Sequence, residues 1–209
     1  MATRGPIVVI VSAPSGSGKT TIVNALISRM PEVGRSISYT TRPRREGEVE
    51  GEDYYFVSQE EFEERKNNKD FLEWEENFGN YYGTSREQVD SVLGEGRDII
   101  LSIDVKGARS VKDIYQDAIS VFIMPPSRQE LAERLRKRNT DEAAQVLRRL
   151  QESKKEIDAA DEYDYLIVNK DLTRAVEELA GIIENERRNR EKIDKRTGQN
   201  GKDIQTSAY

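Results

Sequence analysis

Cysteine and histidine are both absent from the 209 residues of this chain. Without cysteine there are no disulfides and no thiol chemistry. Without histidine there are no histidine-containing zinc sites, catalytic triads or imidazole general bases. Any catalysis therefore uses lysine, arginine, carboxylates, tyrosine, hydroxyl groups or a metal ion. Phosphoryl transfer is the large reaction class that tolerates this set, because it depends on positioning and charge neutralisation more than on a base.

Long apolar runs and an excess of basic residues are missing as well. No run approaches the roughly 18 residues that a membrane span needs, and residues 1–6 lack the apolar stretch of a signal peptide. We therefore expect a cytoplasmic protein with no membrane partner. The net charge is −6, whereas a general nucleic-acid binder would be basic, so no nucleic-acid partner is expected. The sequence leaves the oligomeric state open.

One short segment, Ala13-Pro14-Ser15-Gly16-Ser17-Gly18-Lys19-Thr20, has the pattern of a phosphate-binding loop. It follows the apolar run 7–11 and leads into a predicted helix. Its two glycines let backbone N–H groups curl around anionic oxygens, and the helix start adds its positive end. Lys19 would neutralise the β- and γ-phosphates of ATP, and the Thr20 hydroxyl would bind Mg²⁺.

The loop departs from the usual pattern at one position, because Ala13 stands where a glycine is expected. Alanine is the smallest change available there. The alternative is an ordinary glycine-rich turn between a strand and a helix. The Gly-Lys-Thr offset and both flanking segments favour the phosphate loop.

Apolar runs alternate with predicted helices along the rest of the chain, which predicts an α/β protein. Continuous apolar runs at 98–103, 120–124 and 165–168 are typical of buried parallel strands, so we expect a three-layer P-loop fold with a central parallel sheet. Capping boxes begin helices at Ser58, Thr84 and Ser127, and Asp171 is expected to cap a long helix to about Arg190.

Two polar stretches do not fit this alternation and carry clustered arginines, which indicates inserts that close over anionic ligands. The expected division is a core of residues 4–34, 84–125 and 159–192, a first insert of 35–83, a second insert or lid of 126–158, and a polar tail of 193–209. We expect this tail to be disordered.

The first insert holds candidate residues for a second anion site. Arg42 and Arg45 with Tyr54 and Tyr82 would make an oxyanion clamp, since arginine supplies forked donors and tyrosine a neutral one. The alternative is a solvated basic turn. Glu73 lies in the β-like piece 71–74, on the same face as residue 71 if side chains alternate strictly. It is either an edge-strand charge or a buried acceptor for a base with adjacent N–H donors, which guanine has and adenine lacks.

Seven motifs together resemble the guanylate kinase family, from about Gly5 to Lys192. They are Ser-Ala-Pro-Ser-Gly-Ser-Gly-Lys-Thr, Ser-x-Ser-x-Thr-Thr-Arg-x-x-Arg-x-Gly-Glu, Gly-x-Asp-Tyr-x-Phe, Phe-Leu-Glu-Trp, Gly-Asn-Tyr-Tyr-Gly-Thr, Ile-Asp-Val-x-Gly-Ala and Ile-Val-Asn. The resemblance implies that the first insert binds GMP. It also implies transfer of the γ-phosphoryl group of ATP to GMP, and to dGMP, with Mg²⁺, giving GDP and ADP in purine nucleotide metabolism and GMP recycling.

The resemblance also implies roles for individual residues. GMP would be held by Ser38, Arg42, Arg45, Glu48, Tyr54, Glu73, Tyr82, Thr84 and Asp104. ATP would be held by the loop Ala13–Thr20 with Arg134, Arg138 and Asn169. Lys19, Arg138 and Arg149 would be catalytic.

Each of these assignments has an alternative in the sequence. Arginines in helices rich in Lys and Arg are usually solvated, and Asp104 could simply cap the end of a strand. The family usually has an acidic residue where this chain has Ser102, so a contact to Mg²⁺ or to a substrate is expected to be weaker here.

Two other functions fit parts of the pattern. A non-catalytic guanylate-kinase-like module would hold a phosphorylated peptide, but such modules typically lose the phosphate loop or the lid arginines. Another P-loop kinase, for thymidylate or adenylate, is disfavoured by Glu73 and by the spacing of Arg42 and Arg45.

Overall fold

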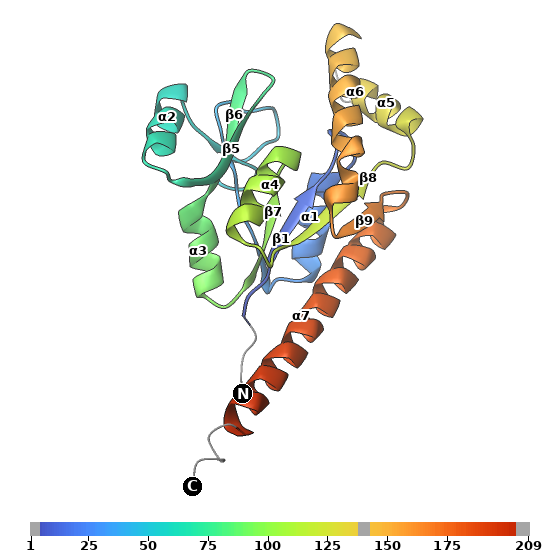
Figure 1. Cartoon of the computed structure of the whole chain (residues 1–209). Coiled ribbons are helices and arrows are strands. Elements are labelled where there is room, and N and C mark those ends of the chain that lie inside the picture. The colour runs from blue at the N-terminus through green and yellow to red at the C-terminus, as the bar shows by residue number, and fades with distance from the viewer. Residues whose placement is uncertain (1–4, 138–142, 204–209) are drawn as a thin grey trace.

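The structure, a computed structural model, describes residues 5–137 and 143–203, with the backbone only for Lys137, 143–148 and 194–203. Its centre is a five-stranded parallel sheet in the order β2-β7-β1-β8-β9 (Figure 1). The strands are β1 (Val8–Ser12), β2 (Val33–Arg35), β7 (Asp98–Ser102), β8 (Ile119–Met124) and β9 (Tyr165–Val168). The predicted α/β fold with a central parallel sheet is confirmed.

Helices cover both faces of this sheet, and the alternation of side chains along β1 decides which face each residue serves. Val9 and Val11 pack with α1 (Lys19–Arg29) and α7 (Leu172–Asp203) in one apolar cluster. Val8 and Ile10 pack on the other face, in a cluster with α3 (Arg86–Gly94) and α4 (Val105–Ile114). Both faces are apolar because both are covered, which explains the continuous apolar runs of the sequence.

A second, smaller sheet projects from the core on one side. Its order is β4-β3-β6-β5, with β3 (Tyr39–Thr40), β4 (Tyr55–Phe56), β5 (Phe71–Asn77) and β6 (Asn80–Ser85). Helix α2 (Gln59–Asn67) packs on it through Phe62, which is fully buried and stacks on Phe71 at 4.6 Å and on Tyr81 at 5.4 Å between ring centroids. This aromatic cluster gives the smaller sheet a core of its own.

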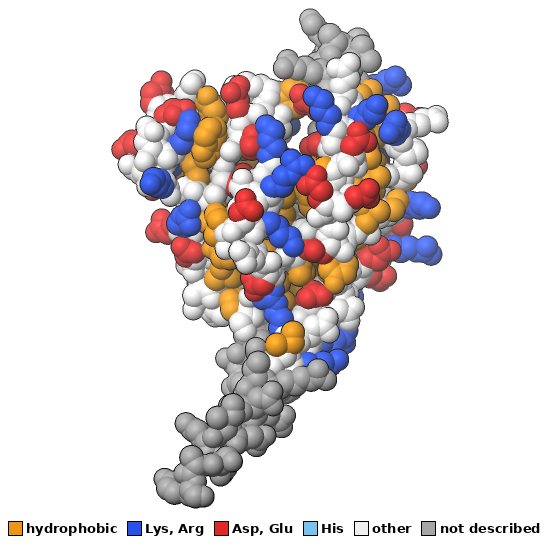
Figure 2. All heavy atoms as spheres, viewed as in Figure 1, with side chains coloured by type: hydrophobic (Ala, Val, Ile, Leu, Met, Phe, Trp, Pro, Cys, Tyr) orange, Lys and Arg blue, Asp and Glu red, His pale blue; other side chains and the backbone are white. Residues whose placement is uncertain are grey.

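Two helices project on the other side, α5 (Arg128–Lys137) and α6 (Ala143–Asp158), followed by a short 3₁₀ turn at Ala160–Glu162. Figure 1 shows them standing across the molecule from the smaller sheet. Figure 2 shows acidic and basic side chains interspersed over one face of the molecule, as the mixed charges of the sequence require. None of the helices in the described part of the chain is long and apolar enough to cross a membrane.

The helix boundaries differ from the expectation at two places. Helix α3 is capped by Ser85, whose side chain accepts a hydrogen bond from the Gln88 N–H, so the capping box expected at Thr84 is wrong by one residue. Helix α7 continues to Asp203 instead of ending near Arg190. The caps expected at Ser58, Ser127 and Asp171 are confirmed.

Candidate nucleotide-binding site

The loop between β1 and α1 has the conformation that its sequence predicts. Gly16 and Gly18 have positive φ angles, 89° and 92°, and Gly18 is the N-cap residue of α1. A side chain at position 18 would be doubly unfavourable, because its Cβ would also lie 2.5 Å from Nδ2 of Asn169. The predicted strand, glycine loop and helix are thus in place at the carboxyl edge of the sheet, where ligands bind in such folds.

Ala13, the residue that departs from the loop pattern, has a structural explanation. Its side chain is 7% exposed and belongs to the apolar cluster between the sheet and α1. Its φ angle is not positive, so the backbone there does not need glycine. The methyl group therefore packs in the core and leaves the loop conformation unchanged.

Lys19 lies at the centre of a group of carboxylates. Its Nζ donates a hydrogen bond to the Ile103 carbonyl at 2.8 Å. Burial lowers the pKa of Lys19, while the charges of Asp104, Glu156 and Glu73 act in the opposite direction. These three acids come from three different elements, and their charges partly offset the effect of burial on the Lys19 ammonium.

Glu73 is buried although β5 is an edge strand of the smaller sheet, so it is not a solvent-exposed charge. It is 9% exposed, and its Oε1 accepts a hydrogen bond from the Thr84 hydroxyl at 2.5 Å. Burial raises the pKa of Glu73 to about 7, against the hydrogen bond from Thr84. A Cβ at Gly107 would lie 2.6 Å from its Oε2, so the start of α4 needs a glycine to accommodate the carboxylate.

Strict alternation along β5 does not hold at this residue. Phe71, Leu72 and Glu73 are all buried, because the register with β6 shifts between Phe71 and Glu73. Such bulges change the direction of a side chain and are common beside functional sites. Here the Glu73 carboxylate lies against the start of α4, at Gly107.

The arginine clamp is organised by Glu48. Arg42 makes a two-pronged ion pair with it, at 2.7 Å and 3.0 Å, and Oε2 of Glu48 also accepts the Arg45 N–H at 2.8 Å. Burial opposes ionisation of Glu48, but these hydrogen bonds hold its pKa below the ordinary value. Arg42 also lies over the Tyr54 ring, 5.3 Å from its centroid, and Tyr54 contacts Tyr82 edge to face at 6.0 Å. The structure therefore brings the predicted clamp residues together, with the Arg45 side chain exposed.

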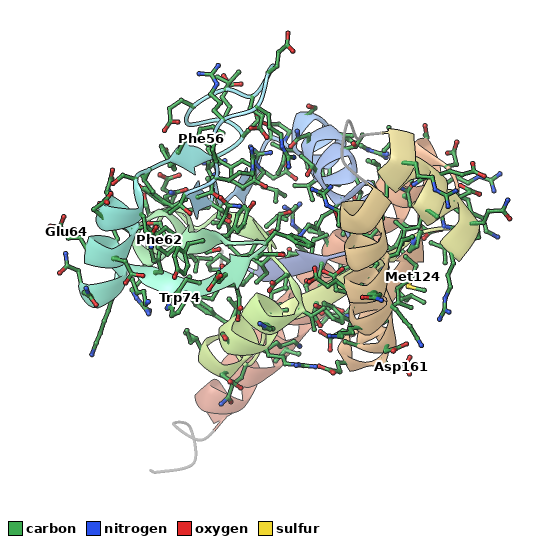
Figure 3. The ribbon with its side chains drawn as sticks, turned by 90° about the horizontal axis from the view of Figure 1, so that it is seen from above. Phe56, Phe62, Glu64, Trp74, Met124 and Asp161 are labelled. Carbon is green, nitrogen blue, oxygen red and sulfur yellow. The ribbon has the colours of Figure 1, made fainter. Side chains whose placement is uncertain are left out.

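A small cavity joins the clamp to the phosphate loop. Thr20 and Ser38 line it together with Tyr54 and Ser102. Figure 3 views the molecule from above, with Phe62 and Trp74 in the half of the smaller sheet and Met124 and Asp161 in the half of α6. Ser102, which replaces the expected acidic residue, lines this cavity between the clamp and the phosphate loop with a neutral hydroxyl side chain.

Asp104 and Asn169 both have structural partners. Asp104 is the N-cap residue of α4 and accepts the Gly107 N–H at 2.8 Å, so the strand-end cap named as an alternative is present. Its charge nevertheless acts on Lys19 and Glu73. Asn169 is buried and donates from Nδ2 to the Ser17 carbonyl at 2.7 Å, which fixes the back of the phosphate loop.

The expected lid arginines have different surroundings. Arg134 on α5 pairs with Glu130 one turn earlier, at 3.4 Å. Arg149 on α6 lies over the Phe78 ring, 5.6 Å from its centroid, at the tip of the β5–β6 hairpin. This contact joins the two projections of the molecule. Arg138 lies outside the described residues.

Sequence reasoning missed one residue of the site, Glu156. It comes from α6, and Lys19 and the backbone N–H of Ser15 are among the groups that act on its carboxyl group. Burial raises the pKa of Glu156 to about 7. The sequence carries no signal for it, because Glu156 is one charge in a helix with charges on every side.

The fold and the site define a P-loop nucleotide-binding protein with two facing projections. Comparison with known proteins narrows this class. The guanylate kinase family model matches residues 5–186. A guanylate kinase of Symbiobacterium thermophilum is 50% identical over 177 residues, covering 85% of this chain and 84% of the relative. One of Thermotoga maritima is 43% identical over 190 residues, covering 89% and 92%.

A solved structure agrees. The crystal structure of guanylate kinase from Anaplasma phagocytophilum superposes with a TM-score of 0.76 at 34% identity, over 90% of this chain and 89% of that one. The chain belongs to the guanylate kinase family.

Proposed function

We propose that this chain transfers the γ-phosphoryl group of ATP to GMP, giving ADP and GDP, and that dGMP is a second acceptor. Family membership over the whole described core supports the reaction class. The single observation that carries the acceptor is the buried Glu73, held by Thr84 beside the phosphate loop. A carboxylate can accept from both N1–H and N2–H of guanine, and adenine offers no such pair of donors.

On the donor side, the backbone of Ala13–Thr20 and the ammonium of Lys19 hold the ATP phosphates. Lys19 is buried among carboxylates, so its charge acts through a medium of low polarity and is worth more than at the surface. Asn169 stiffens the loop through Ser17. Arg134 on α5 and Arg149 on α6, together with Arg138, would close over the phosphoryl group in transfer.

On the acceptor side, Arg42 and Arg45 with Tyr54 and Tyr82 hold the GMP phosphate. Glu48 pre-orients the Arg42 guanidinium, which reduces the entropy lost on binding. Burial raises the pKa of Tyr54, so its hydroxyl keeps its proton and donates. Ser38 and Thr84 complete the contacts to the base, and Asp104 lies between the two nucleotides. The phosphate oxygen of GMP attacks in line, and no side-chain base is needed.

Magnesium fits the donor set of this site. Thr20 lines a cavity in which Ser36, Ser38, Tyr54, Ser102 and Asp53 offer oxygen atoms, the hard ligands that Mg²⁺ prefers, and which Val23 and Arg35 also line. Among the described residues no cluster of three or more acidic side chains is placed to hold a metal, as expected for an ion bound mainly through substrate phosphates. Thr20 would hold the ion, which supplies charge neutralisation when bound. The cytoplasmic location expected from the sequence stays a prediction.

The test is a coupled ADP-release assay with ATP and Mg²⁺ and with GMP, dGMP or AMP as acceptor. We expect ADP release that depends on GMP and dGMP and is weak with AMP. Equal use of GMP and AMP would overturn the guanine assignment. Absence of any acceptor-dependent ADP would instead favour the non-catalytic module.

A further inference from the structure

A second cavity lies along β5, and none of the arginine-clamp residues lines it. Its volume is about 480 Å³, which is within the range of small-molecule sites. Among the residues proposed to hold GMP or ATP, only Glu73 contributes to its wall. Figure 3 shows Trp74, another wall residue, at the margin of the smaller sheet, between α2 and α4. The cavity is therefore separate from the clamp and from the phosphate loop.

Three cations line this cavity in a protein whose net charge is −6. Lys66 and Lys69 come from the end of α2, and Arg86 is the first residue of α3. The Asp70 carbonyl accepts the Arg86 N–H at 2.8 Å, which holds the two helix ends together. Lys66 pairs with Glu63 at 3.2 Å, but within the described ranges no ion pair engages the side chain of Lys69 or Arg86. Two of the three charges are thus available to an anion.

Lys69 occupies a backbone position that favours glycine. Its φ angle is 62°. The Lys69 N–H donates to the Lys66 carbonyl at 3.1 Å, and the Asp70 N–H donates to the Arg65 carbonyl at 3.0 Å. These two bonds form the helix-ending motif in which the left-handed residue is usually glycine. A lysine that keeps a strained conformation at the wall of a cavity suggests a role for its side chain.

The rest of the wall is largely apolar. Phe71 and Leu72 contribute to it, and so does Trp74, which is 40% exposed. The Lys66 Nζ lies over the Trp74 ring, 4.0 Å from its centroid. A cationic surface and an aromatic surface therefore lie side by side in one cavity.

The two acidic residues of the wall have other partners. Glu75 forms an ion pair with Lys106 at 3.0 Å. Glu73 accepts the Thr84 hydroxyl, and its other oxygen lies against the start of α4 at Gly107. Neither carboxylate neutralises Lys69 or Arg86 directly.

We propose that this cavity is a second ligand site, for a small phosphate monoester that carries an aromatic ring. The phosphate binds between Lys69 and Arg86, and the ring packs against Trp74. A phosphate monoester carries up to two negative charges and so suits several cations better than a carboxylate does. The inference goes beyond the proposed function and does not rest on it, since the cavity lies outside the clamp and the phosphate loop.

The experiment uses Trp74 as its own reporter, because it is the only tryptophan of the chain. The full-length protein is titrated with phenyl phosphate while tryptophan fluorescence is recorded, and we expect a saturable change. Inorganic phosphate lacks the ring and benzoate lacks a second charge, so each should bind at least about tenfold more weakly. No saturable change with phenyl phosphate, or equal affinity for all three compounds, would overturn the proposal.

The Lys69→Gly variant tests the anion contact without endangering the fold. Glycine removes the charge and also suits the positive φ angle, so a thermal melt should show a stability equal to or above that of the parent. We expect phenyl phosphate to bind about tenfold more weakly, the effect of one lost charge-assisted contact. Unchanged binding in this folded variant would show that the phosphate does not use Lys69 and would overturn the proposal.

Two further variants locate the ligand. Lys192→Ala removes the same charge from an exposed position of α7, and Arg45→Ala removes an exposed arginine of the clamp. Both should bind phenyl phosphate within twofold of the parent. A loss in Lys192→Ala equal to that in Lys69→Gly would mean that only net charge matters. A loss in Arg45→Ala would place the ligand in the clamp, and either result would contradict a separate site.

Discussion

The proposed donor and acceptor sides of this site are built from different parts of the polypeptide. The donor side is mostly backbone, with one loop of eight residues, two glycines at positive φ and a single buried lysine. The acceptor side is made of side chains from several segments of the smaller sheet, held by ion pairs such as Arg42–Glu48. Backbone donors are fixed by the fold of one segment, whereas side-chain donors need neighbours to orient them. Mutations should therefore act on the two sides in different ways.

The largest effect is expected for Lys19, because no other side chain of the phosphate loop carries a positive charge. Lys19→Met should lower kcat by about 10³-fold, because the charge is removed from a buried position where water does not substitute for it. The KM for GMP should change little, since Lys19 belongs to the other side. The measurement is steady-state ADP release, with a thermal melt to show that the variant is folded. A kcat within tenfold of the parent would mean that the loop backbone alone neutralises the phosphates.

The acceptor side should respond in KM instead. Arg42→Lys keeps the charge but loses the forked geometry that matches both Glu48 and a phosphate. We expect the KM for GMP to rise roughly 100-fold, the scale of a lost charge-assisted hydrogen bond. The KM for ATP should stay within about twofold, because no donor-side contact is removed.

Arg44→Lys is the matched control for this variant. Arg44 lies two residues away in the same loop and is exposed, and its Nε donates to the backbone carbonyl of Glu48. Lysine keeps the charge and a donor for that carbonyl, so this change should leave both KM values nearly unaltered. Equal effects of the two substitutions would mean that the loop acts through its overall charge and not through an oriented clamp.

Much of the donor side could be predicted from the sequence, and the reason is that it is local. Eight consecutive residues specify the loop, and continuous apolar runs specify the parallel strands that flank it. The acceptor side was predicted only as a set of residue types. The bulge at Glu73 and the Thr84 hydrogen bond depend on pairing between β5 and β6, which alternation along one strand does not show.

The α5–α6 side shows where sequence reasoning fails. Charges alternate around α6, so nothing distinguishes Glu156 at the phosphate loop from Asp158 in water. Only tertiary packing assigns a face to such a helix, here through Leu150 and Ile157. The sequence likewise does not decide the partner of Arg134, because Glu130 lies one turn earlier on the same helix and forms an ion pair with it.

Recognition of the base tests the comparison further, because Glu73 is proposed to serve the acceptor side, yet its charge also acts on Lys19 on the donor side. Glu73→Gln should reduce the preference for GMP over AMP roughly 30-fold, since an amide presents one acceptor and one donor where the base has two donors. The measurement is the ratio of kcat/KM for the two acceptors. Glu75→Gln, at an ion pair with Lys106 two residues along β5, is the control and should keep the parent ratio.

The pH dependence follows from the burial of the same carboxyl. Because its pKa is raised to about 7, Glu73 takes up a proton as the pH falls through 7 and loses its acceptor. The kcat/KM for GMP should therefore fall about tenfold between pH 8 and pH 6 in the parent, since this parameter reports the free enzyme. The Glu73→Gln variant should lack that step. An identical pH profile in both proteins would assign the titration to the GMP phosphate.

The smallest effect is expected where the donor side departs from its pattern. Ala13→Gly restores the usual loop sequence, but Ala13 packs in the apolar cluster under α1 and has no positive φ. Glycine there would remove a buried methyl group and add freedom to the unfolded chain. We expect a loss of about 1–2 kcal/mol in the free energy of unfolding, measured by urea denaturation, with kcat and both KM values within twofold of the parent. A gain in activity without loss of stability would show that position 13 acts on the phosphates. The expected result would mean that Ala13 is a core residue, and that the phosphates are bound by the backbone of the loop residues that follow it.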